Sequence, residues 1–127
     1  MPLELSVIIP TYGRSEKLRT LLEGIATTKD DHDAFEVIVV VDGHDEAPLE
    51  VASALPTTVR FRGLTKVHAG PAAARNFALN HAQGDWLLFF DDDARVDQHT
   101  IPGHLDHIRR DPEAPLAYLG RVDWPDE

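Results

Sequence analysis

Three short, mostly apolar runs constrain the fold of this chain more than any other feature. They are SVIIP at 6–10, VIVVV at 37–41 and WLLFF at 86–90. Each run is too short for a buried helix and is rich in β-branched or aromatic residues, so each predicts a strand. Because apolar residues in these runs are consecutive and do not alternate with polar ones, the runs predict buried strands of a parallel sheet that is covered on both faces.

Helical periodicity fills the segments between these runs. Leucine and isoleucine recur at spacings of three and four residues at Leu18, Leu21, Leu22 and Ile25, and again at Ile101, Leu105 and Ile108. We expect Ser15 to cap the first of these helices. Residues 71–83 predict another helix, with Pro71 in its first turn and Gly84 just past its end. Its apolar stripe comprises Ala74, Phe77, Ala78 and Ala82.

Three weaker elements complete the expected pattern. A short helix is predicted at 48–55, a strand near the sheet edge at 58–62 and a last strand at 116–122. Strands that alternate with helices predict a Rossmann-like three-layer α/β/α fold with a mostly parallel sheet. The chain has 127 residues, of which 43% are apolar, so we expect a single domain over 1–127.

Composition limits the partners of this domain. Its 22 acidic and 12 basic residues give a net charge of −10, which argues against nucleic acid as a partner. The chain has no cysteine, which excludes disulfides, thiol catalysis and cysteine-bound zinc. No apolar run approaches the ~18 residues of a membrane span, and the N-terminus carries no signal pattern. We therefore expect a cytoplasmic protein, with peripheral attachment at the inner face of the membrane and homo-oligomerisation as further options.

A polar patch follows each buried run. TYGR occupies 11–14, DGH occupies 42–44 and DDD occupies 91–93. In an open α/β sheet, ligands bind beyond the carboxyl ends of the strands. The three patches are far apart in the sequence, but parallel strands would bring them to one rim.

The aspartates at 91–93 are candidates for a metal site. If the segment is extended, Asp91 and Asp93 project to the same side. Two hard oxygen donors suit Mg²⁺ or Mn²⁺, which leaves its other positions to water and substrate phosphates. The alternative is an acidic loop that caps the next helix.

Three further side chains are candidates for binding a nucleotide. Arg75 lies one turn inside a predicted helix, where a helix N-terminus and an arginine suit a diphosphate, although a surface ion pair is the alternative. Asp42 could accept hydrogen bonds from a base or sugar, or could simply form an Asp-Gly turn. Tyr12 could stack on a nucleobase.

Taken together, the patches resemble the inverting nucleotide-sugar glycosyltransferases of family 2, which have the GT-A fold. SVIIPTYGR is similar to the family's opening SVIIPTYNR, and VIVVVDGHDE resembles IIVVDDGSTD. The segment from 70 to 94, GPAAARNFALNHAQGDWLLFFDDDA, resembles GxxxARNxGxxxAxGxxxxFLDxDD. The resemblance runs from about residue 4 to the end of the chain.

This resemblance implies a role for each matching residue. The nucleotide pocket would be lined by Pro10, Thr11, Tyr12 and Arg14. Asp42 would match the base-binding aspartate and Arg75 the arginine beside the nucleotide. Asp91 to Asp93 would cover the DXD motif, with Asp93 and then Asp91 as metal ligands, and with Asp92 or Asp91 facing the ribose or sugar. Val41 and Gly13 depart from the family's usual aspartate and asparagine, which leaves the base preference open.

The implied reaction transfers a sugar from a nucleotide-diphosphate sugar, with a UDP-sugar favoured, to a hydroxyl of a sugar, lipid or protein acceptor, with inversion. In the family, the general base lies downstream of the DXD segment, and no motif supports the late carboxylates Asp123, Asp126 and Glu127 in that role. We therefore expect this chain to be the donor- and metal-binding half of such an enzyme. A non-catalytic nucleotide-binding or assembly module is the alternative. A phosphate-accepting receiver domain needs an acidic pair after the first strand, and a P-loop protein needs GxxxxGK[ST]; both patterns are missing here.

Overall fold

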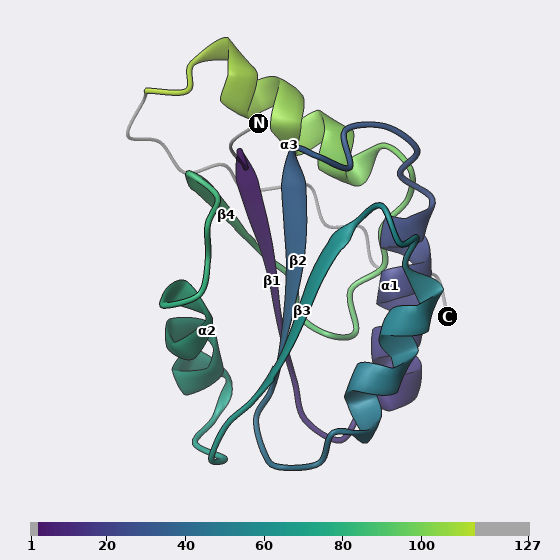
Figure 1. Cartoon of the computed structure of the whole chain (residues 1–127), viewed down its shortest axis with the longest axis vertical. Coiled ribbons are helices and arrows are strands. Elements are labelled where there is room, and N and C mark those ends of the chain that lie inside the picture. The colour runs from purple at the N-terminus through teal and green to yellow at the C-terminus, as the bar shows by residue number, and fades with distance from the viewer. Residues whose placement is uncertain (1–2, 114–127) are drawn as a thin grey trace, which may run out of the picture.

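The computed structural model describes residues 3–113 and folds them around a four-stranded sheet (Figure 1). The strands are β1 (Leu5–Thr11), β2 (Phe35–Val41), β3 (Arg60–Thr65) and β4 (Trp86–Phe89). Their order is β3-β2-β1-β4, and every pair of neighbours is parallel. Leu5 lies opposite both Phe35 and Trp86, so β1, β2 and β4 begin at the same level. The predicted α/β class with a parallel sheet is confirmed.

Helices cover both faces of the sheet. The helical elements are α1 (Ser15–Ala26), the 3-10 helix η1 (Ala47–Ala54), α2 (Pro71–Leu79) and α3 (Thr100–Arg110). In Figure 1, α2 lies on one side of the sheet, α1 and η1 lie on the other, and α3 crosses the amino end of the strands. The fold is therefore the expected three-layer Rossmann-like arrangement.

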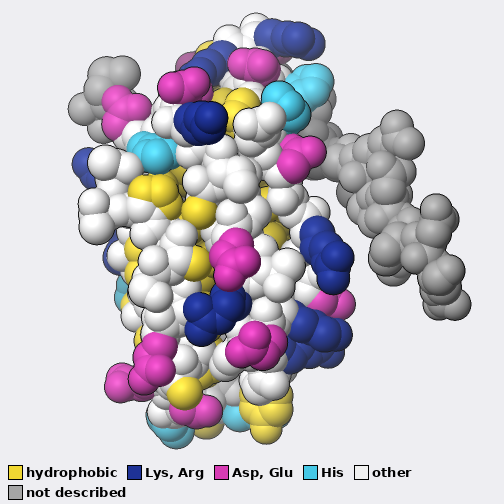
Figure 2. All heavy atoms as spheres, turned by 90° about the vertical axis from the view of Figure 1, so that its right-hand side faces the viewer, with side chains coloured by type: hydrophobic (Ala, Val, Ile, Leu, Met, Phe, Trp, Pro, Cys, Tyr) yellow, Lys and Arg dark blue, Asp and Glu magenta, His cyan; other side chains and the backbone are white. Residues whose placement is uncertain are grey.

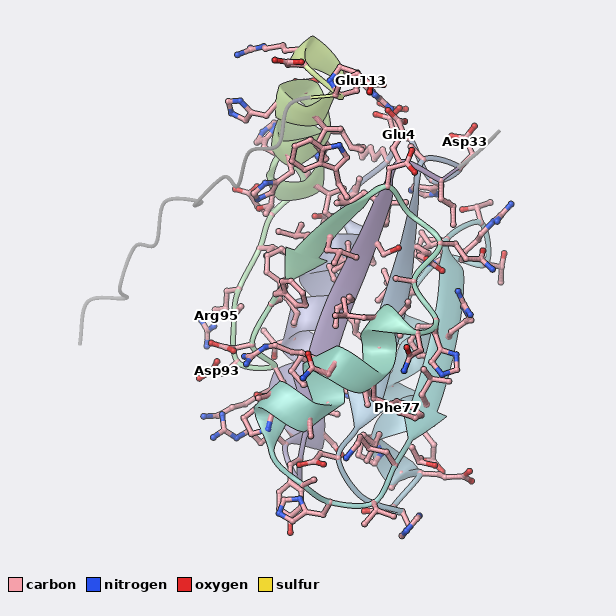
Figure 3. The ribbon with its side chains drawn as sticks, turned by 90° about the vertical axis from the view of Figure 1, so that its left-hand side faces the viewer. Glu4, Asp33, Phe77, Asp93, Arg95 and Glu113 are labelled. Atoms are coloured by element: carbon pink, nitrogen blue, oxygen red, sulfur yellow. The ribbon has the colours of Figure 1, made fainter. Side chains whose placement is uncertain are left out.

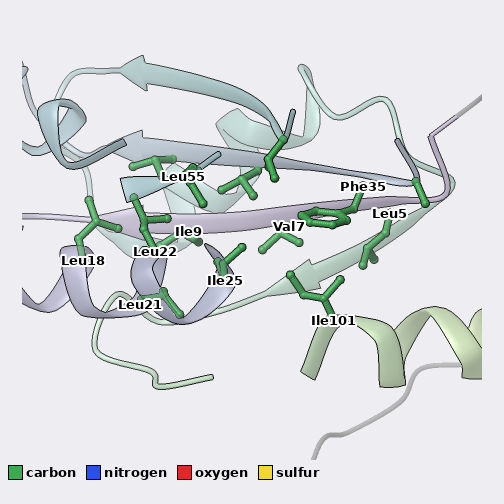
Figure 4. Packing of buried hydrophobic residues seen from close by; sticks show 14 of the residues in the cluster. Leu5, Val7, Ile9, Leu18, Leu21, Leu22, Ile25, Phe35, Leu55 and Ile101 are labelled. Carbon is green, nitrogen blue, oxygen red and sulfur yellow. The ribbon is translucent and has the colours of Figure 1, made fainter. Parts of the chain in front are cut away.

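Alternation along the central strands divides the core into two clusters. On β1, Val7 and Ile9 face a larger cluster that receives α1 residues such as Leu18 and Leu22, as Figure 4 shows. Ile8 points to the opposite face and packs with Ala74 and Ala78 of α2, among others. Burying each large apolar side chain contributes roughly 1.5–3 kcal/mol. Because both faces are covered, β1 and β2 read as unbroken apolar runs.

The third apolar run does not behave like the other two. β4 pairs with β1 and forms an edge of the sheet among the described residues. Leu87 is 39% exposed and Phe89 44% exposed, whereas Trp86 and Leu88 pack against the larger cluster. The prediction of a strand is correct, but the prediction of full burial is wrong because only one face of β4 is covered. The predicted edge position of the 58–62 segment is confirmed by β3.

Two predicted helix ends are also corrected. Ser15 is the first residue of α1 and makes no capping hydrogen bond; the N-cap position belongs to Arg14. α2 ends at Leu79, well before Gly84. Gly84 instead lies against β1, where its N–H donates to Ser6 Oγ at 2.8 Å. A Cβ at Gly84 would lie 2.6 Å from the backbone of Leu5 and Ser6, so close approach to β1 explains this glycine.

The predicted strand at 116–122 lies outside the described residues, as do Asp123, Asp126 and Glu127. Within 3–113, no helix is long and apolar enough to cross a membrane. On the face that carries α1 and η1, acidic and basic side chains are interspersed and do not form a single charged patch (Figure 2).

Candidate functional site

The three polar patches meet at one pocket. The carboxyl ends of the strands border a cavity of ≈ 520 Å³. All nine residues singled out from the sequence line it: Pro10, Thr11, Tyr12, Arg14, Asp42, Arg75, Asp91, Asp92 and Asp93. The structure adds His68 and Pro71 to this set. Figure 3 shows Asp93 near the start of α2, with Glu4 toward the opposite end of the sheet.

The end of β1 supplies one wall. Thr11 is the last residue of the strand and is buried, whereas Tyr12 is 58% exposed. Gly13 follows with φ +64, a left-handed conformation that glycine adopts easily and asparagine tolerates. The sharp turn brings Arg14 back toward the aspartates after β4. Position 13 therefore suits either glycine or asparagine.

Asp42, at the end of β2, organises the loop between β3 and α2. Its carboxylate accepts the N–H groups of Ala69 at 2.9 Å and Gly70 at 2.8 Å. Lys66 Nζ and His68 Nδ1 also lie within 3.5 Å and 2.9 Å of it. Burial alone raises the pKa of this carboxyl, but these hydrogen bonds and neighbouring positive charges outweigh burial and lower the pKa below its ordinary value.

The same loop sets the start of α2. Gly70 has φ +100 directly before Pro71, a backbone conformation that residues with a Cβ rarely adopt. Pro71 then opens the helix, as predicted. Asp42 therefore fixes where α2 begins and, through it, where Arg75 lies.

Asp91 to Asp93 form a turn and are not extended. β4 ends at Phe89, and Ala94 N–H donates to Asp91 O at 3.0 Å. The expectation of an extended segment that projects Asp91 and Asp93 to the same side is therefore wrong. Asp92 points inward and is buried, whereas Asp91 and Asp93 lie at the surface with side chains 71% and 50% exposed.

Each aspartate has a partner across the pocket. Thr11 Oγ1 donates to Asp92 Oδ2 at 2.9 Å, and Arg14 donates to Asp92 Oδ1 at 3.3 Å. Arg14 also lies 3.7 Å from Asp93, and Arg75 pairs with Asp91 at 3.0 Å. The aspartates do not cap α3; the carboxylate that accepts a backbone N–H just before that helix belongs to Asp97. For Arg75, the ion pair considered from the sequence is present, and it lies at the pocket.

The pocket has two chemically different ends. Tyr12 and His68 stack at one end with ring centroids 4.3 Å apart, beside the ends of β2 and β3. Arg14, Arg75 and the three aspartates occupy the other end, beside β4. An elongated ligand with an aromatic head and an anionic tail matches this division.

The charged end offers hard ligands for a divalent ion. Asp91 and Asp93 provide exposed carboxylate oxygens beside two arginines. Among residues 3–113, no group of three or more histidine, cysteine, aspartate or glutamate side chains is placed to hold a metal alone. The donor chemistry fits Mg²⁺ or Mn²⁺ bound by one or two carboxylates together with ligand phosphates.

His68 was missed because the sequence argument followed only the three apolar runs. β3 is a partly exposed edge strand, and its polar continuation at 66–70 was not considered as a fourth patch. The rule that ligands bind beyond strand ends applies equally to β3. Applied there, it would have found His68.

Comparison with known proteins identifies the family of this chain. A family model described as glycosyl transferase family 2 matches residues 6–122. The chain belongs to glycosyl transferase family 2. An uncharacterised glycosyltransferase of Haemophilus influenzae is 39% identical over 115 residues, which is 90% of this chain and 37% of that protein.

Solved structures of other glycosyltransferases share the fold. Staphylococcus aureus TarS, a poly(ribitol-phosphate) β-N-acetylglucosaminyltransferase, has been solved in complex with UDP-GlcNAc. That structure has a TM-score of 0.74 and 30% identity and covers 85% of this chain and 32% of its own. A mannosyltransferase from Pyrobaculum calidifontis, in complex with GDP-Man and Mn²⁺, has a TM-score of 0.75 at 22% identity and covers 91% of this chain and 35% of its own. The family 2 chain described here thus has the GT-A type of fold. It spans 37% of the length of the Haemophilus influenzae protein and 18% of the length of TarS.

Proposed function

We propose that this chain is the donor-binding part of an inverting glycosyltransferase that uses a nucleotide-diphosphate sugar. The observation that carries the proposal is the division of one pocket into an aromatic end and a charged end. A nucleoside diphosphate has the same two parts. Membership of family 2 and the UDP-GlcNAc complex of TarS support the same conclusion.

The proposed orientation follows from the residues at each end. The base lies at Tyr12 and His68, and the diphosphate lies beside Arg14, Arg75 and the first turn of α2. Arg75 and the N-terminal N–H groups of α2 bind phosphate oxygens. Both arginines are already directed into the pocket by ion pairs with Asp91 and Asp92, so little reorganisation is needed when the anion binds.

Asp93 and Asp91 are the proposed ligands for Mg²⁺ or Mn²⁺. When bound, the ion would act as a Lewis acid that stabilises negative charge on the departing diphosphate. Asp92 holds the turn in place through Thr11 and Arg14. Arg75 contributes a fixed positive charge beside Asp91.

Transfer with inversion also needs a general base within reach of the acceptor hydroxyl. The pocket residues other than Asp91 to Asp93 include one carboxylate, Asp42, which is occupied by the loop before α2. We infer that the base comes from residues outside 3–113. The described residues therefore account for donor binding and stabilisation of the leaving group.

The experiment that tests this function is a calorimetric titration of UDP, GDP and dTDP into the chain, each with and without Mn²⁺. Metal-dependent binding of at least one nucleotide is the expected result. A folded chain that binds none of them would contradict the proposal. Incubation with the corresponding nucleotide sugars then separates an enzyme, which transfers or slowly hydrolyses the donor, from a module that only binds it.

A further inference from the structure

The segment that leads from the aspartates to α3 passes directly over Gly24 of α1. A Cβ at Gly24 would lie 3.1 Å from Val96 Cγ2 and 3.2 Å from the Val96 carbonyl carbon, and it would overlap the Val96 carbonyl oxygen. Ala94 and Val96 pack against the larger core cluster, to which α1 contributes, and Figure 1 shows the segment on the side of the sheet that carries α1. A residue without a side chain at position 24 is therefore what lets the Val96 backbone approach the helix.

Contacts on both sides of Asp93 hold the chain there. Before it, Asp92 is buried and accepts a hydrogen bond from Thr11 at 2.9 Å. After it, Val96 rests on Gly24. Within residues 3–113, the half-exposed Asp93 side chain makes one ion pair, at 3.7 Å. So long and exposed a contact fixes little, and the position of Asp93 is therefore set mainly by the backbone on its two sides.

A side chain at position 24 would displace the segment and not the helix. Leu21 and Ile25, which flank Gly24 on α1, are 0% exposed, so a movement of α1 would disturb the core. Val96 is only partly buried, so it can move at lower cost. Because Asp93 lies three residues before Val96, we expect the displacement to reach it.

We propose that Gly24 is a positioning residue for the metal ligand Asp93. This inference rests on the proposed function, in which Asp93 and Asp91 bind Mg²⁺ or Mn²⁺. A bound ion holds its oxygen ligands within about 0.2 Å of their preferred distances. Loss of a group that supports a ligand from behind typically lowers metal affinity by about 10- to 100-fold. Gly24 acts on metal binding in this way, through the backbone of residues 94–96.

The test is Gly24→Ala, titrated with UDP, GDP or dTDP, whichever the wild-type chain binds, in the presence and absence of Mn²⁺. The ratio of the two affinities measures the metal dependence. We expect the ratio to fall about tenfold in Gly24→Ala. The affinity without Mn²⁺ should stay close to the wild-type value, because Tyr12, His68 and Arg75 lie on other segments.

Gly103→Ala is the matched control. It makes the same change inside α3, where nothing lies within 4 Å of the added Cβ, and it should leave both affinities unchanged. A second variant reaches the same contact from the other side. Val96→Gly leaves α1 unaltered but loosens the backbone of the segment, so it should also lower the ratio. Thermal unfolding shows which variants are folded.

The outcomes separate this inference from the function on which it rests. A folded Gly24→Ala that keeps the wild-type ratio overturns the inference and leaves the function standing. Equal losses of affinity with and without Mn²⁺ also overturn it, because Gly24 would then support the pocket in general. If Gly24→Ala does not fold, a folded Val96→Gly with the wild-type ratio overturns it. If the folded wild-type chain binds no nucleoside diphosphate, or binds it without metal dependence, the proposed donor or metal site is wrong and the inference fails with it.

Discussion

Thr11 and Asp92 are joined by a buried hydrogen bond of 2.9 Å between residues 81 positions apart in the sequence. The last paired residues of β1 and β4 are Ile8 and Phe89. The Thr11–Asp92 hydrogen bond therefore joins the two chain segments beyond the point where strand pairing ends. Asp92 is thereby fixed inward, and its neighbours Asp91 and Asp93 are left at the surface. The burial of Asp92 and the exposure of Asp91 and Asp93 follow from this contact.

Thr11→Val removes that hydrogen bond while keeping the shape of the side chain. We expect a loss of about 1–2 kcal/mol in the free energy of unfolding, because Asp92 then lacks one partner in a buried position. Urea denaturation measures the loss. Thr20→Val is the matched control, since the Thr20 hydroxyl bonds to its own helix at an exposed site and should change stability little. Equal effects of the two substitutions would contradict the assigned role of Thr11.

Arg75→Ala should weaken UDP binding by about tenfold or more while affecting uridine binding little, because only UDP carries the diphosphate that Arg75 is proposed to contact. Parallel titrations of the two ligands measure the difference. Arg110→Ala, an exposed arginine at the end of α3, is the control for general loss of positive charge. Similar losses for UDP and uridine would place Arg75 away from the diphosphate.

Asp93→Ala should abolish the Mn²⁺-dependent part of UDP binding and leave the fold intact. The side chain is half-exposed and lies 3.7 Å from Arg14, so its removal costs little stability. Titration with and without Mn²⁺, together with thermal unfolding, checks both statements. Asp106→Ala changes the net charge equally on the exposed side of α3. Unchanged metal dependence in Asp93→Ala would reject Asp93 as a metal ligand.

Glu36 makes stability depend on pH. Burial alone raises the pKa of its carboxyl, but hydrogen bonds from Ser6, the Gln83 N–H and Arg62 outweigh burial and lower the pKa. A carboxyl with a lowered folded-state pKa stabilises the fold above its unfolded pKa of about 4.3, and the contribution is lost as pH falls through the folded value.

Glu36→Gln should therefore reduce stability near neutral pH by about 1–3 kcal/mol, because one buried oxygen acceptor becomes a donor facing other donors. It should also flatten the fall in stability below about pH 4. Urea midpoints at neutral and acidic pH measure both effects. Glu16→Gln, on the exposed side of α1, is the control. A Glu36→Gln protein with the wild-type pH profile would contradict the assignment.

Gly84→Ala and Gly103→Ala should have opposite effects. A Cβ at Gly84 would lie 2.6 Å from the backbone of β1, whereas nothing lies within 4 Å of one at Gly103 inside α3. The first change should destabilise the fold by at least about 1 kcal/mol, because the strand must move. The second should stabilise it by up to about 1 kcal/mol, through helix propensity. Thermal unfolding of both variants decides the matter; a neutral Gly84→Ala would contradict the close packing.

Sequence patterns were reliable where one local preference acted alone. The apolar spacing of Leu18, Leu21, Leu22 and Ile25 gave the buried face of α1, and the unbroken runs in β1 and β2 gave two buried strands. They were misleading where long-range contacts compete with local preference. Gly84 resembles a helix stop, but it is required by the close approach of β1, and Leu87 and Phe89 are apolar although that face of β4 is exposed.

The sequence by itself determined the fold class and nine of the residues at the rim, because unbroken apolar runs predict parallel strands and parallel strands end on the same side. It could not determine what each rim residue does there, since that depends on partners far away in the chain. Only the tertiary structure showed that the Asp42 carboxylate is taken up by the backbone of residues 69 and 70, that Asp92 turns inward to Thr11, and that His68 stacks on Tyr12. Hydrogen bonds and ring contacts between distant residues decide which polar groups are used within the fold and which remain available for a ligand.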